Sequence, residues 1–435
     1  MPDGRAPVAI VGGGFSGTMV AANLARRNIR SVLIEGNGLA GRGVAFSTRD
    51  PAHLLNVPAG NMSAWPDEPD DFAVLAGDGA AFAERRIFGR YLGSILDQAI
   101  GSGNVQLVEG RIVGAARGNE GWRLELDDGQ SLDADALVLA TGNQMPAKLP
   151  IADAARDRLI SNPWGETARA AIEDASRNSL DVLIVGTGLT MVDVVLSLDS
   201  AGYSGRILAL SRRGLVPKSH GPYDPHPAQR HEVPTGALRD VTRWLRDRAG
   251  AAGWRAAVDS LRPHSHHIWQ SLPEQDQDRF LRHARPWWDV HRHRIAPQVA
   301  RRLDELMEEG RLEVVGGRIL TAHTVGEAVE VSIRLRGEAE PIPPRRFGYI
   351  FNCTGPLGDI RRTSDPLLRQ LLDDGAIGPD DLSIGLAADE RSRVGERLWA
   401  LGTLTKGRYW EIIAVPDIRE QAAAVAEDIA MELGQ

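Results

Sequence analysis

The chain has 435 residues, of which 43% are hydrophobic and 25% are charged, and its formal net charge is −8. This composition is typical of a globular protein and excludes a disordered or collagen-like chain, while the acidic charge argues against a general nucleic-acid-binding protein. The single cysteine, Cys353, excludes an intramolecular disulfide and any multi-cysteine zinc or iron–sulfur site.

Nothing in the sequence indicates a membrane segment or an export signal. No apolar run reaches the roughly 18 residues that a membrane helix requires. The first residues, MPDGRAPVAIVGGG, do not resemble a signal peptide, because an acid lies beside the arginine and the apolar stretch leads into a glycine motif. We therefore expect a cytoplasmic protein with no membrane partner, in keeping with its low cysteine content.

The first recognisable unit is a strand, a glycine-rich turn, a helix and a second strand. The apolar run 8–11 leads into residues 12–17, which read G-x-G-x-x-G, and a helical stretch 18–28 follows. The second apolar run, 31–34, ends at Glu35, which lies 23 residues after the first glycine. Glu35 would accept hydrogen bonds from ribose hydroxyls and repel a 2′-phosphate. The unit predicts a site for FAD or NAD.

The residues of this turn have distinct roles in such a site. Gly12 allows the tight turn, Gly14 lets the backbone approach a pyrophosphate, and Gly17 lets the helix pack close to the strand. The free N–H groups at the start of the helix, at Phe15 and Ser16, attract phosphates. A glycine-rich turn with only a packing role is the alternative.

A second unit of the same kind begins with the apolar run 181–185. Its turn residues are Gly186, Thr187, Gly188, Leu189 and Thr190. Met191 stands where the third glycine would be, so the motif is broken at its helix-packing position. A helical run 192–200 and a strand 206–210 complete the unit and predict a second dinucleotide site.

The second unit ends in basic residues instead of an acid. Ser211, Arg212 and Arg213 follow the strand, and Arg212 lies 26 residues after Gly186. A hydroxyl and two guanidinium groups supply the charge and the forked donors that a 2′-phosphate requires. We therefore expect NADPH to be preferred over NADH. Two solvated arginines at a strand end are the alternative.

Two further apolar runs end alike. Residues 135–140 are followed by Thr141 and Gly142, and residues 349–353 are followed by Thr354 and Gly355. Such strand ends suit a chain that passes close to a cofactor or crosses between domains.

Together these features resemble the two-domain flavoproteins that include flavin-containing monooxygenases and disulfide-reductase-like enzymes. A closer resemblance is to bacterial FAD/NAD(P)-binding proteins, to which aspartate N-hydroxylases look related. The segments that carry it are GRGVAFSTRDPAHLLNVPAGNMSAWP (41–66), RRIFGRYL (85–92), DALVLATGN (135–143), VLIVGTGLTMVD (182–193), SRRGLVPKSH (211–220), WDVHRHRIAP (288–297), FNCTGP (351–356) and LGTLTKGRYWEIIAVPDIREQA (401–422). The resemblance implies an α/β fold of two nested Rossmann-like dinucleotide-binding domains with a mostly helical cap insert.

The resemblance also implies the cofactors and their domains. FAD would bind the outer domain, formed by residues 1–150 and 346–435, and NADPH the nested domain, formed by residues 151–217 and 298–345, with the cap insert at 218–297. A loop at 43–63 would cover the flavin, and the last helix would begin at Pro416 with its N-terminus facing the flavin. The further positions assigned to FAD are Gly43, Asn56, Val57, Met62, Thr141, Gly142, Gly402, Ala414 and Val415.

The chain also departs from better-known relatives. Flavin-containing and Baeyer–Villiger monooxygenases carry F-x-G-x-x-x-H before the second glycine motif, whereas residues 159–164 read LISNPW and contain no such histidine. This argues against Baeyer–Villiger chemistry. Because Cys353 is the only cysteine, dithiol chemistry within one chain is excluded, and we expect Cys353 to be a small buried hydrophobe.

The insert at 218–297 holds nine of the 11 histidines and five of the ten tryptophans. Helical patterns at 238–249, 254–261 and 275–285 predict a cap over the flavin and the substrate, with aromatic residues supplying apolar contact area. The histidines lack the spacing of a helical metal pair, so no metal is expected. They are interpreted as structural or surface groups, or in part as substrate contacts.

The leading functional hypothesis is an NADPH-dependent flavin monooxygenase. It would oxygenate a nucleophilic nitrogen or sulfur of a small molecule with O2, through a C4a-(hydro)peroxyflavin. Asn56 is the predicted catalytic amide, with Asn61 as a second candidate. The alternatives are a flavin reductase that passes electrons to a small molecule or a partner protein, and a redox-sensing binding protein. A homodimer is compatible with either enzyme.

Overall fold

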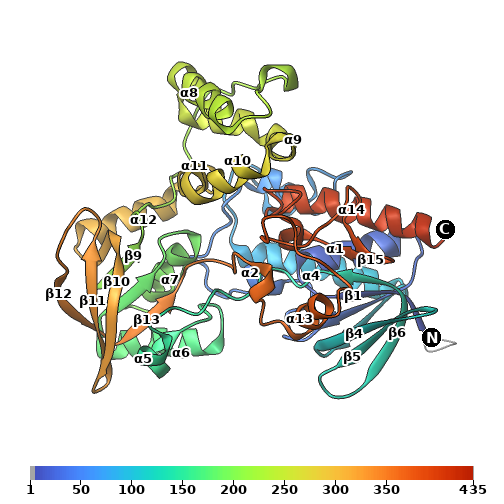
Figure 1. Ribbon diagram of the computed structural model, residues 1–435, viewed down its shortest axis with the longest axis horizontal. Coiled ribbons are helices and arrows are strands. Elements are labelled where there is room, and N and C mark those ends of the chain that lie inside the picture. Colours follow the sequence, from blue (N-terminus) through green and yellow to red (C-terminus); the bar gives the residue numbers. More distant parts are fainter. Residues whose placement is uncertain (1–4, 435) are drawn as a thin grey trace.

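The computed structural model describes residues 5–434. Two sheet-based units stand side by side, and a helical insert rises above them (Figure 1). The first unit holds both ends of the described chain, and the second unit is formed by the middle of the sequence. This is the nested arrangement that the sequence predicts, and the fold is α/β as expected.

The first sheet has eight strands, with the order β14-β15-β6-β1-β2-β3 and with β4 and β5 continuing from β6. Its strands are β1 (Arg5–Val11), β2 (Ser31–Glu35), β3 (Val105–Glu109), β4 (Ile112–Gly118), β5 (Gly121–Leu126), β6 (Ser131–Leu139), β14 (Arg393–Gly395) and β15 (Leu398–Ala400). The pairs among β15, β6, β1, β2 and β3 are parallel, whereas β4, β5 and β6 form antiparallel pairs.

Both faces of this first sheet are covered, which explains its nearly continuous apolar strands. Val8 and Ile10 face a core shared with α1 (Phe15–Arg26), α4 (Arg85–Gly101) and α14 (Val415–Glu432). On the other face of β1, Ala9 and Val11 contribute to a second core, formed with β4, β5 and α13 (Pro366–Asp373). The predicted last helix is confirmed, and it begins one residue before Pro416.

The second sheet has seven strands in the order β12-β11-β10-β9-β8-β13-β7. Its strands are β7 (Leu159–Ile160), β8 (Val182–Val185), β9 (Ile207–Ser211), β10 (Leu312–Val325), β11 (Ala328–Leu335), β12 (Ile342–Phe347) and β13 (Tyr349–Asn352). The pairs β7–β13, β13–β8, β8–β9 and β9–β10 are parallel. The pairs β10–β11 and β11–β12 are antiparallel. The accompanying helices are α6 (Glu166–Asn178), α7 (Leu189–Ser200) and α12 (Pro297–Glu308).

One predicted boundary differs from the structure. A return to the first unit at residue 346 would place β13 in the first sheet, but β13 pairs with β8 and β7 inside the second sheet. The chain therefore leaves the second unit only after β13. The apolar run of β13 suits either sheet, because strand partners are chosen by packing over long sequence distances.

The insert is mostly helical, as predicted. Its helices are α8 (Leu238–Leu261), α9 (Ser265–Ser271), α10 (Glu274–Arg279), a π-helical turn (Phe280–Ala284) and α11 (Arg285–Arg292). Non-helical angles at Gly253 break α8 where the sequence predicts two helices. Shorter helices are α2 (Gly43–Phe46), α3 (Asp71–Ala76) and α5 (Ala152–Ala155), with single 3-10 turns elsewhere. Among residues 5–434, none of the helices combines the length and the apolar character needed to cross a bilayer.

Candidate active site

The first glycine turn leaves no space for side chains at two of its positions. Gly12 has φ of +107°, and a Cβ added there would lie 2.3 Å from the carbonyl oxygen of Ala140, at the end of β6. A Cβ on Gly17 would lie 1.9 Å from the carbonyl oxygen of Gly12. Glycine therefore allows both the turn and the close packing of α1 against β1, as the motif predicts.

Three segments distant in the sequence meet at the N-terminus of α1. A Cβ on Gly43 would lie 2.9 Å from the Cα of Gly14, and a Cβ on Gly402 would lie 3.1 Å from Oγ of Ser16. No side chain caps the start of α1. The N–H groups and the positive end of the helix dipole are thus available to an anion, and the surrounding backbone forms a cradle that a Cβ would partly fill. The cradle fits the pyrophosphate of a dinucleotide.

Glu35 is buried beside this cradle, with 7% of its surface exposed. One carboxylate oxygen accepts a hydrogen bond from the Gly13 N–H and the other from the Asn37 N–H, both at 2.8 Å. Each oxygen has more than one acceptor position, so a ribose hydroxyl can still donate to the carboxylate. The two backbone N–H groups thus fix the orientation of the Glu35 carboxylate.

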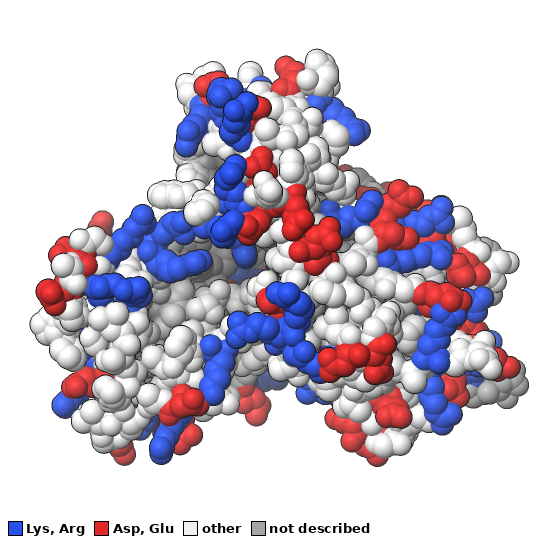
Figure 2. Space-filling model, in the orientation of Figure 1, with Lys and Arg blue, Asp and Glu red and all other residues white. Residues whose placement is uncertain are grey.

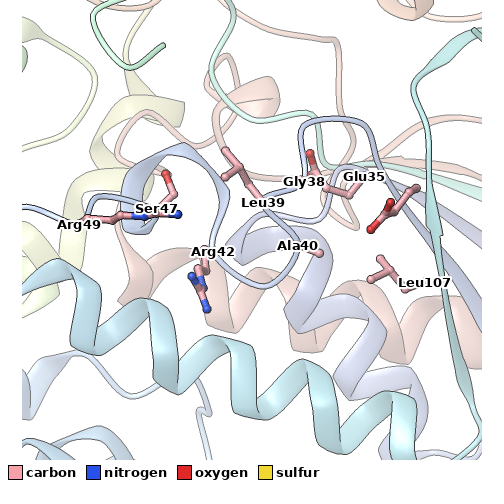
Figure 3. A pocket seen from close by; sticks show the side chains of 9 residues that line it. Glu35, Gly38, Leu39, Ala40, Arg42, Ser47, Arg49 and Leu107 are labelled. Atoms are coloured by element: carbon pink, nitrogen blue, oxygen red, sulfur yellow. The ribbon is translucent and has the colours of Figure 1, made fainter. Parts of the chain in front are cut away.

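A cavity of about 300 Å³ opens beside Glu35. Figure 3 shows Glu35 and Leu107 on one side of the cavity and Arg42, Ser47 and Arg49 on the other. Glu109 also lines it, because the parallel register pairs Glu35 with Glu109. Arg42, Arg49 and Glu109 were not predicted from the sequence. The register of β2 and β3 is the feature that could have identified Glu109.

The loop predicted to cover a flavin contains two amide candidates that lie in different surroundings. Asn56 is partly buried, and its backbone carbonyl oxygen is 3.0 Å from Nε2 of His220, at the start of the insert. Asn61 is exposed. Val57 and Met62 pack against the first core, with Met62 buried. Only Asn56 therefore lies where the loop meets the insert.

The remaining positions predicted for FAD follow strand β6 or begin helix α14. Thr141 and Gly142 directly follow Ala140, whose carbonyl oxygen faces Gly12. Ala414 is the N-cap residue of α14, Val415 is its buried first residue, and no side chain caps this helix. The start of α14 is therefore another free helix N-terminus, which favours negative charge nearby.

The second glycine turn repeats the geometry of the first. Gly186 has φ of +114°, and a Cβ added there would lie 2.0 Å from the carbonyl oxygen of Cys353, at the end of β13. Gly188 faces open space, and no side chain caps α7. Met191 is fully buried in the apolar core of the second unit, so the missing third glycine is replaced by apolar packing. Leu189 and Thr190 form the partly buried first turn of α7.

The basic residues after β9 differ in their surroundings. Arg212 is exposed and Arg213 is partly exposed, and neither makes an ion pair with any residue between 5 and 434. Oγ of Ser211 lies 2.9 Å from Oγ1 of Thr187 and accepts the Gly214 N–H at 2.9 Å. The two guanidinium groups are therefore free for a phosphate, whereas the hydroxyl stabilises the turn. Figure 2 shows Lys and Arg side chains bordering a hollow below the insert.

The two glycines of the second turn provide a matched pair of variants. Gly188→Ala should leave the thermal unfolding midpoint unchanged but weaken NADPH binding, because its Cβ fills only the space that the cofactor would occupy. Gly186→Ala should lower the unfolding midpoint, because its Cβ meets a backbone carbonyl at a positive φ. Calorimetry and NADPH titration of both variants check this. Equal stability losses in the two variants would contradict the assignment.

The insert covers the C-terminal segment of the first unit with aromatic side chains. The rings of Trp269 and Trp410 are stacked with centroids 5.0 Å apart, and Phe280 meets Trp410 edge-on at 5.3 Å. Nε1 of Trp269 donates a hydrogen bond to the carbonyl oxygen of Gly407 at 2.8 Å. These contacts lie within eight residues of Gly402, so the insert closes over the chain that leads away from the α1 cradle.

Glu411, in the C-terminal segment, forms a buried polar contact with the insert. Its side chain is 3% exposed, accepts a hydrogen bond from Nε1 of Trp288 at 2.8 Å, and lies 2.9 Å from Nε of Arg292. Burial alone would raise the pKa of Glu411, but His293, Arg292 and Trp288 outweigh burial and hold the pKa at about 2. The carboxylate is therefore charged at neutral pH and joins the insert to the first unit. Glu411 was not predicted from the sequence.

Lys406 lies in the same segment and is partly exposed. Burial of its amine, together with the neighbouring Arg285, lowers the pKa of Lys406 to about 8, although Asp289 and Glu411 act in the opposite direction. A lysine with this pKa can hold or release a proton near neutral pH.

Cys353 is 4% exposed, as expected for a small buried hydrophobe. Burial and the nearby charge of Asp193 raise the pKa of its thiol, which keeps it protonated and unreactive. Between residues 5 and 434, no group of three or more His, Cys, Asp or Glu side chains is placed to hold a metal ion.

Comparison with known proteins agrees with this arrangement. Residues 9–144 match a protein family described as FAD-NAD(P)-binding. This segment contains the last residues of β1, the first glycine turn, Glu35 and the end of β6, so the match falls on the first unit. No curated protein sequence matches the chain.

Solved structures with the same fold include enzymes of two kinds. The ornithine N-hydroxylase of Kutzneria sp. 744, solved with reduced FAD, NADP+ and L-ornithine, is 16% identical, with a TM-score of 0.65, and the match covers 99% of this chain and 100% of that one. The L-lysine 6-monooxygenase of Pseudomonas syringae is also 16% identical, with a TM-score of 0.65 and coverage of 98% and 99%. The bacillithiol disulfide reductase of Staphylococcus aureus is 14% identical, with a TM-score of 0.57 and coverage of 98% and 99%. The chain thus shares the fold of these enzymes, with two dinucleotide-binding-type sheets.

Proposed function

We propose that the protein is an NADPH-dependent FAD monooxygenase that hydroxylates a nucleophilic nitrogen or sulfur atom of a small molecule, with O2 as co-substrate. The observation that carries this proposal is the closed cover over the C-terminal segment. Trp269 and Trp410 stack there, and Glu411 joins the insert to the first unit from a buried position. An oxygenating flavin enzyme needs such a water-poor site, because water promotes the loss of activated oxygen as peroxide.

The first unit is the proposed FAD site. The α1 cradle would hold the pyrophosphate, and Glu35 would bind the ribose of the adenosine half. FAD, when bound, supplies an acceptor for the hydride of NADPH and a reductant for O2. The free N-terminus of α14 would favour negative charge on the reduced flavin. Asn56 is the side chain proposed to donate a hydrogen bond at the reacting atoms.

The second unit is the proposed NADPH site. Its uncapped α7 would face the pyrophosphate, and Arg212 and Arg213 would bind the 2′-phosphate through charge-assisted hydrogen bonds. Use of NADPH, together with a single buried cysteine, also suits the proposed cytoplasmic location, where thiols stay reduced.

A reductase is the second candidate, and the disulfide reductase among the solved structures favours it. Such an enzyme would pass electrons from NADPH through FAD to a small molecule or to a partner protein. The buried thiol of Cys353 argues against a dithiol relay within this chain. The two candidates therefore differ in the final acceptor and share both cofactor sites.

The deciding experiment follows the fate of oxygen during turnover. The FAD-loaded protein is supplied with NADPH, ¹⁸O2 and a panel of small amines and thioethers, and NADPH use, hydrogen peroxide and labelled product are measured. For a true substrate we expect one ¹⁸O atom in the product per NADPH and a fall in peroxide release. If every compound gives peroxide equal to the NADPH consumed, while an added electron acceptor speeds anaerobic NADPH oxidation, the reductase is the better description.

A further inference from the structure

A buried bridge of polar groups joins the two units. Nη1 of Arg85, at the start of α4 in the first unit, lies 2.9 Å from Oδ2 of Asp193, on α7 in the second unit. The two side chains are only 12% and 6% exposed. Nε of Arg85 also donates to the carbonyl oxygen of Leu54 at 3.0 Å. One guanidinium thus holds the second unit and the flavin-covering loop together.

The same helix is held a second time by His53. Nε2 of His53 lies 3.0 Å from the carbonyl oxygen of Asp193 and 3.0 Å from Oγ of Ser197, and Nδ1 lies 2.8 Å from Oγ1 of Thr48. His53 is 4% exposed. Every polar atom of the ring therefore has a partner, and the imidazole fixes the orientation of the loop against α7.

Apolar contacts and backbone pairing stiffen this bridge. Leu54 and Phe82, from the first unit, pack against the core of the second unit. The Arg85 N–H donates to the carbonyl oxygen of His53 at 2.9 Å, and the Leu55 N–H donates to the carbonyl oxygen of Ala83 at 2.8 Å. Residues 53–55 and 83–85 of the first unit thus form one antiparallel bridge beside the core of the second unit.

The position of the bridge links it to both proposed cofactors. Asp193 lies on the second turn of α7, five residues after Gly188, where the proposed NADPH site begins. Leu54 lies two residues before Asn56, in the loop proposed to cover the flavin. Any change in the Arg85–Asp193 geometry would move one cofactor site relative to the other. Surface ion pairs lack this effect, because they join groups that can separate into solvent.

We infer that Arg85 is a positioning residue for hydride transfer, which acts by holding α7 and the flavin-covering loop at a set separation through Asp193 and Leu54. This inference rests on the proposed function. Hydride transfer moves one proton and two electrons from NADPH to FAD and yields NADP+ and FADH−, with no other reactant. The rate of such a step depends steeply on the distance between donor and acceptor, and a displacement of about 1 Å can cost ~100-fold.

The test is anaerobic stopped-flow reduction of the FAD-loaded protein by NADPH. A double variant, Arg85→Met with Asp193→Leu, removes both charges together and so avoids leaving a buried ion unpaired. We expect its limiting rate of flavin reduction to fall ~10- to 100-fold, with the NADPH dissociation constant within about 2-fold of wild type and the FAD content unchanged. A merely structural role would lower FAD content or thermal stability and leave the limiting rate of the loaded protein intact.

Two further variants complete the test. Arg85→Lys keeps a charge beside Asp193 but removes the Nε–H that donates to the Leu54 carbonyl, so the limiting rate should fall several-fold even if the double variant does not fold. Arg302→Met is the matched control, because Arg302 pairs with Asp199 of the same helix at 2.7 and 2.8 Å but lies within the second unit; its limiting rate should equal that of wild type. If flavin is reduced at the wild-type limiting rate in both Arg85→Lys and the double variant, the inference is wrong. Failure of NADPH to reduce the wild-type flavin overturns the proposed function instead.

Discussion

Replacing Glu411 by Gln is expected to lower the stability of the protein by about 3 kcal/mol at pH 7, because Arg292 is then left buried without its counter-charge. The amide can still accept the hydrogen bond from Trp288, so the loss reports the charge and not the shape of the side chain. We expect a fall of several degrees in the thermal unfolding midpoint and a larger share of NADPH converted to peroxide, since the insert would cover the site less tightly. Calorimetry and a peroxide assay measure both effects.

The same variant makes a prediction about pH. The pKa of Glu411 is about 2 in the folded protein, against an ordinary value of 4.5. As the pH falls below 4.5, the unfolded chain takes up a proton first, so the stability that this carboxylate contributes is present above pH 4.5 and is lost progressively toward pH 2. The gap in unfolding midpoint between wild type and Glu411→Gln should therefore narrow between pH 5 and pH 3.

Glu396 is the control for this pair of measurements. It forms an ion pair with Arg117 on the surface, with its side chain 70% exposed. Glu396→Gln should leave the unfolding midpoint unchanged at pH 7 and at pH 3, because exposed ion pairs contribute little to stability. Equal midpoints for wild type and Glu411→Gln at pH 7, or a gap that does not depend on pH, would remove Glu411 from the role assigned to it.

Replacing Arg212 by Ala is expected to raise the KM for NADPH about tenfold or more while leaving the KM for NADH nearly unchanged. The reason is that a charge-assisted hydrogen bond to the 2′-phosphate contributes ~1.5–3 kcal/mol, and NADH lacks this phosphate. Arg212 makes no ion pair within residues 5–434, so its removal leaves no buried carboxylate unpaired. Steady-state kinetics with each coenzyme, at constant ionic strength, measure the ratio.

Arg346→Ala provides the comparison. Arg346 lies on β12 of the same sheet and forms a surface ion pair with Glu330 at 3.2 Å. Its removal should affect neither coenzyme, whereas Arg212→Ala combined with Arg213→Ala should lose more NADPH preference than either change alone. An equal rise in KM for both coenzymes in Arg212→Ala would mean that this residue does not bind the 2′-phosphate.

Features that depend on short stretches of sequence were predicted well. Gly12 and Gly186 both adopt the positive φ that their turns require. Gly12 lies against Ala140 and Gly186 against Cys353, and each of these two residues directly precedes a Thr-Gly pair. Pro416 marked the start of α14 to within one residue. The predicted helical insert also forms, with its break at Gly253. In each case a few neighbouring residues restrict the backbone, so local sequence is sufficient.

Features that join distant residues were missed. Arg85 and Asp193 are 108 positions apart, and Trp288 and Glu411 are 123 positions apart. Neither pair has a spacing rule, because a charged or aromatic residue finds its partner only after the helices that carry both have packed. The misplaced boundary at residue 346 has the same cause.

The amino-acid sequence alone was therefore enough to locate the two glycine turns, Glu35 and the basic end of β9, because each is specified by residues within about 30 positions. The folded chain had to be known to see that Gly14, Gly43 and Gly402 form one cradle, that the insert closes over Trp410, and that Arg85 joins the two units. Such contacts depend on how whole sheets and helices bury their apolar faces against one another, which no local pattern specifies.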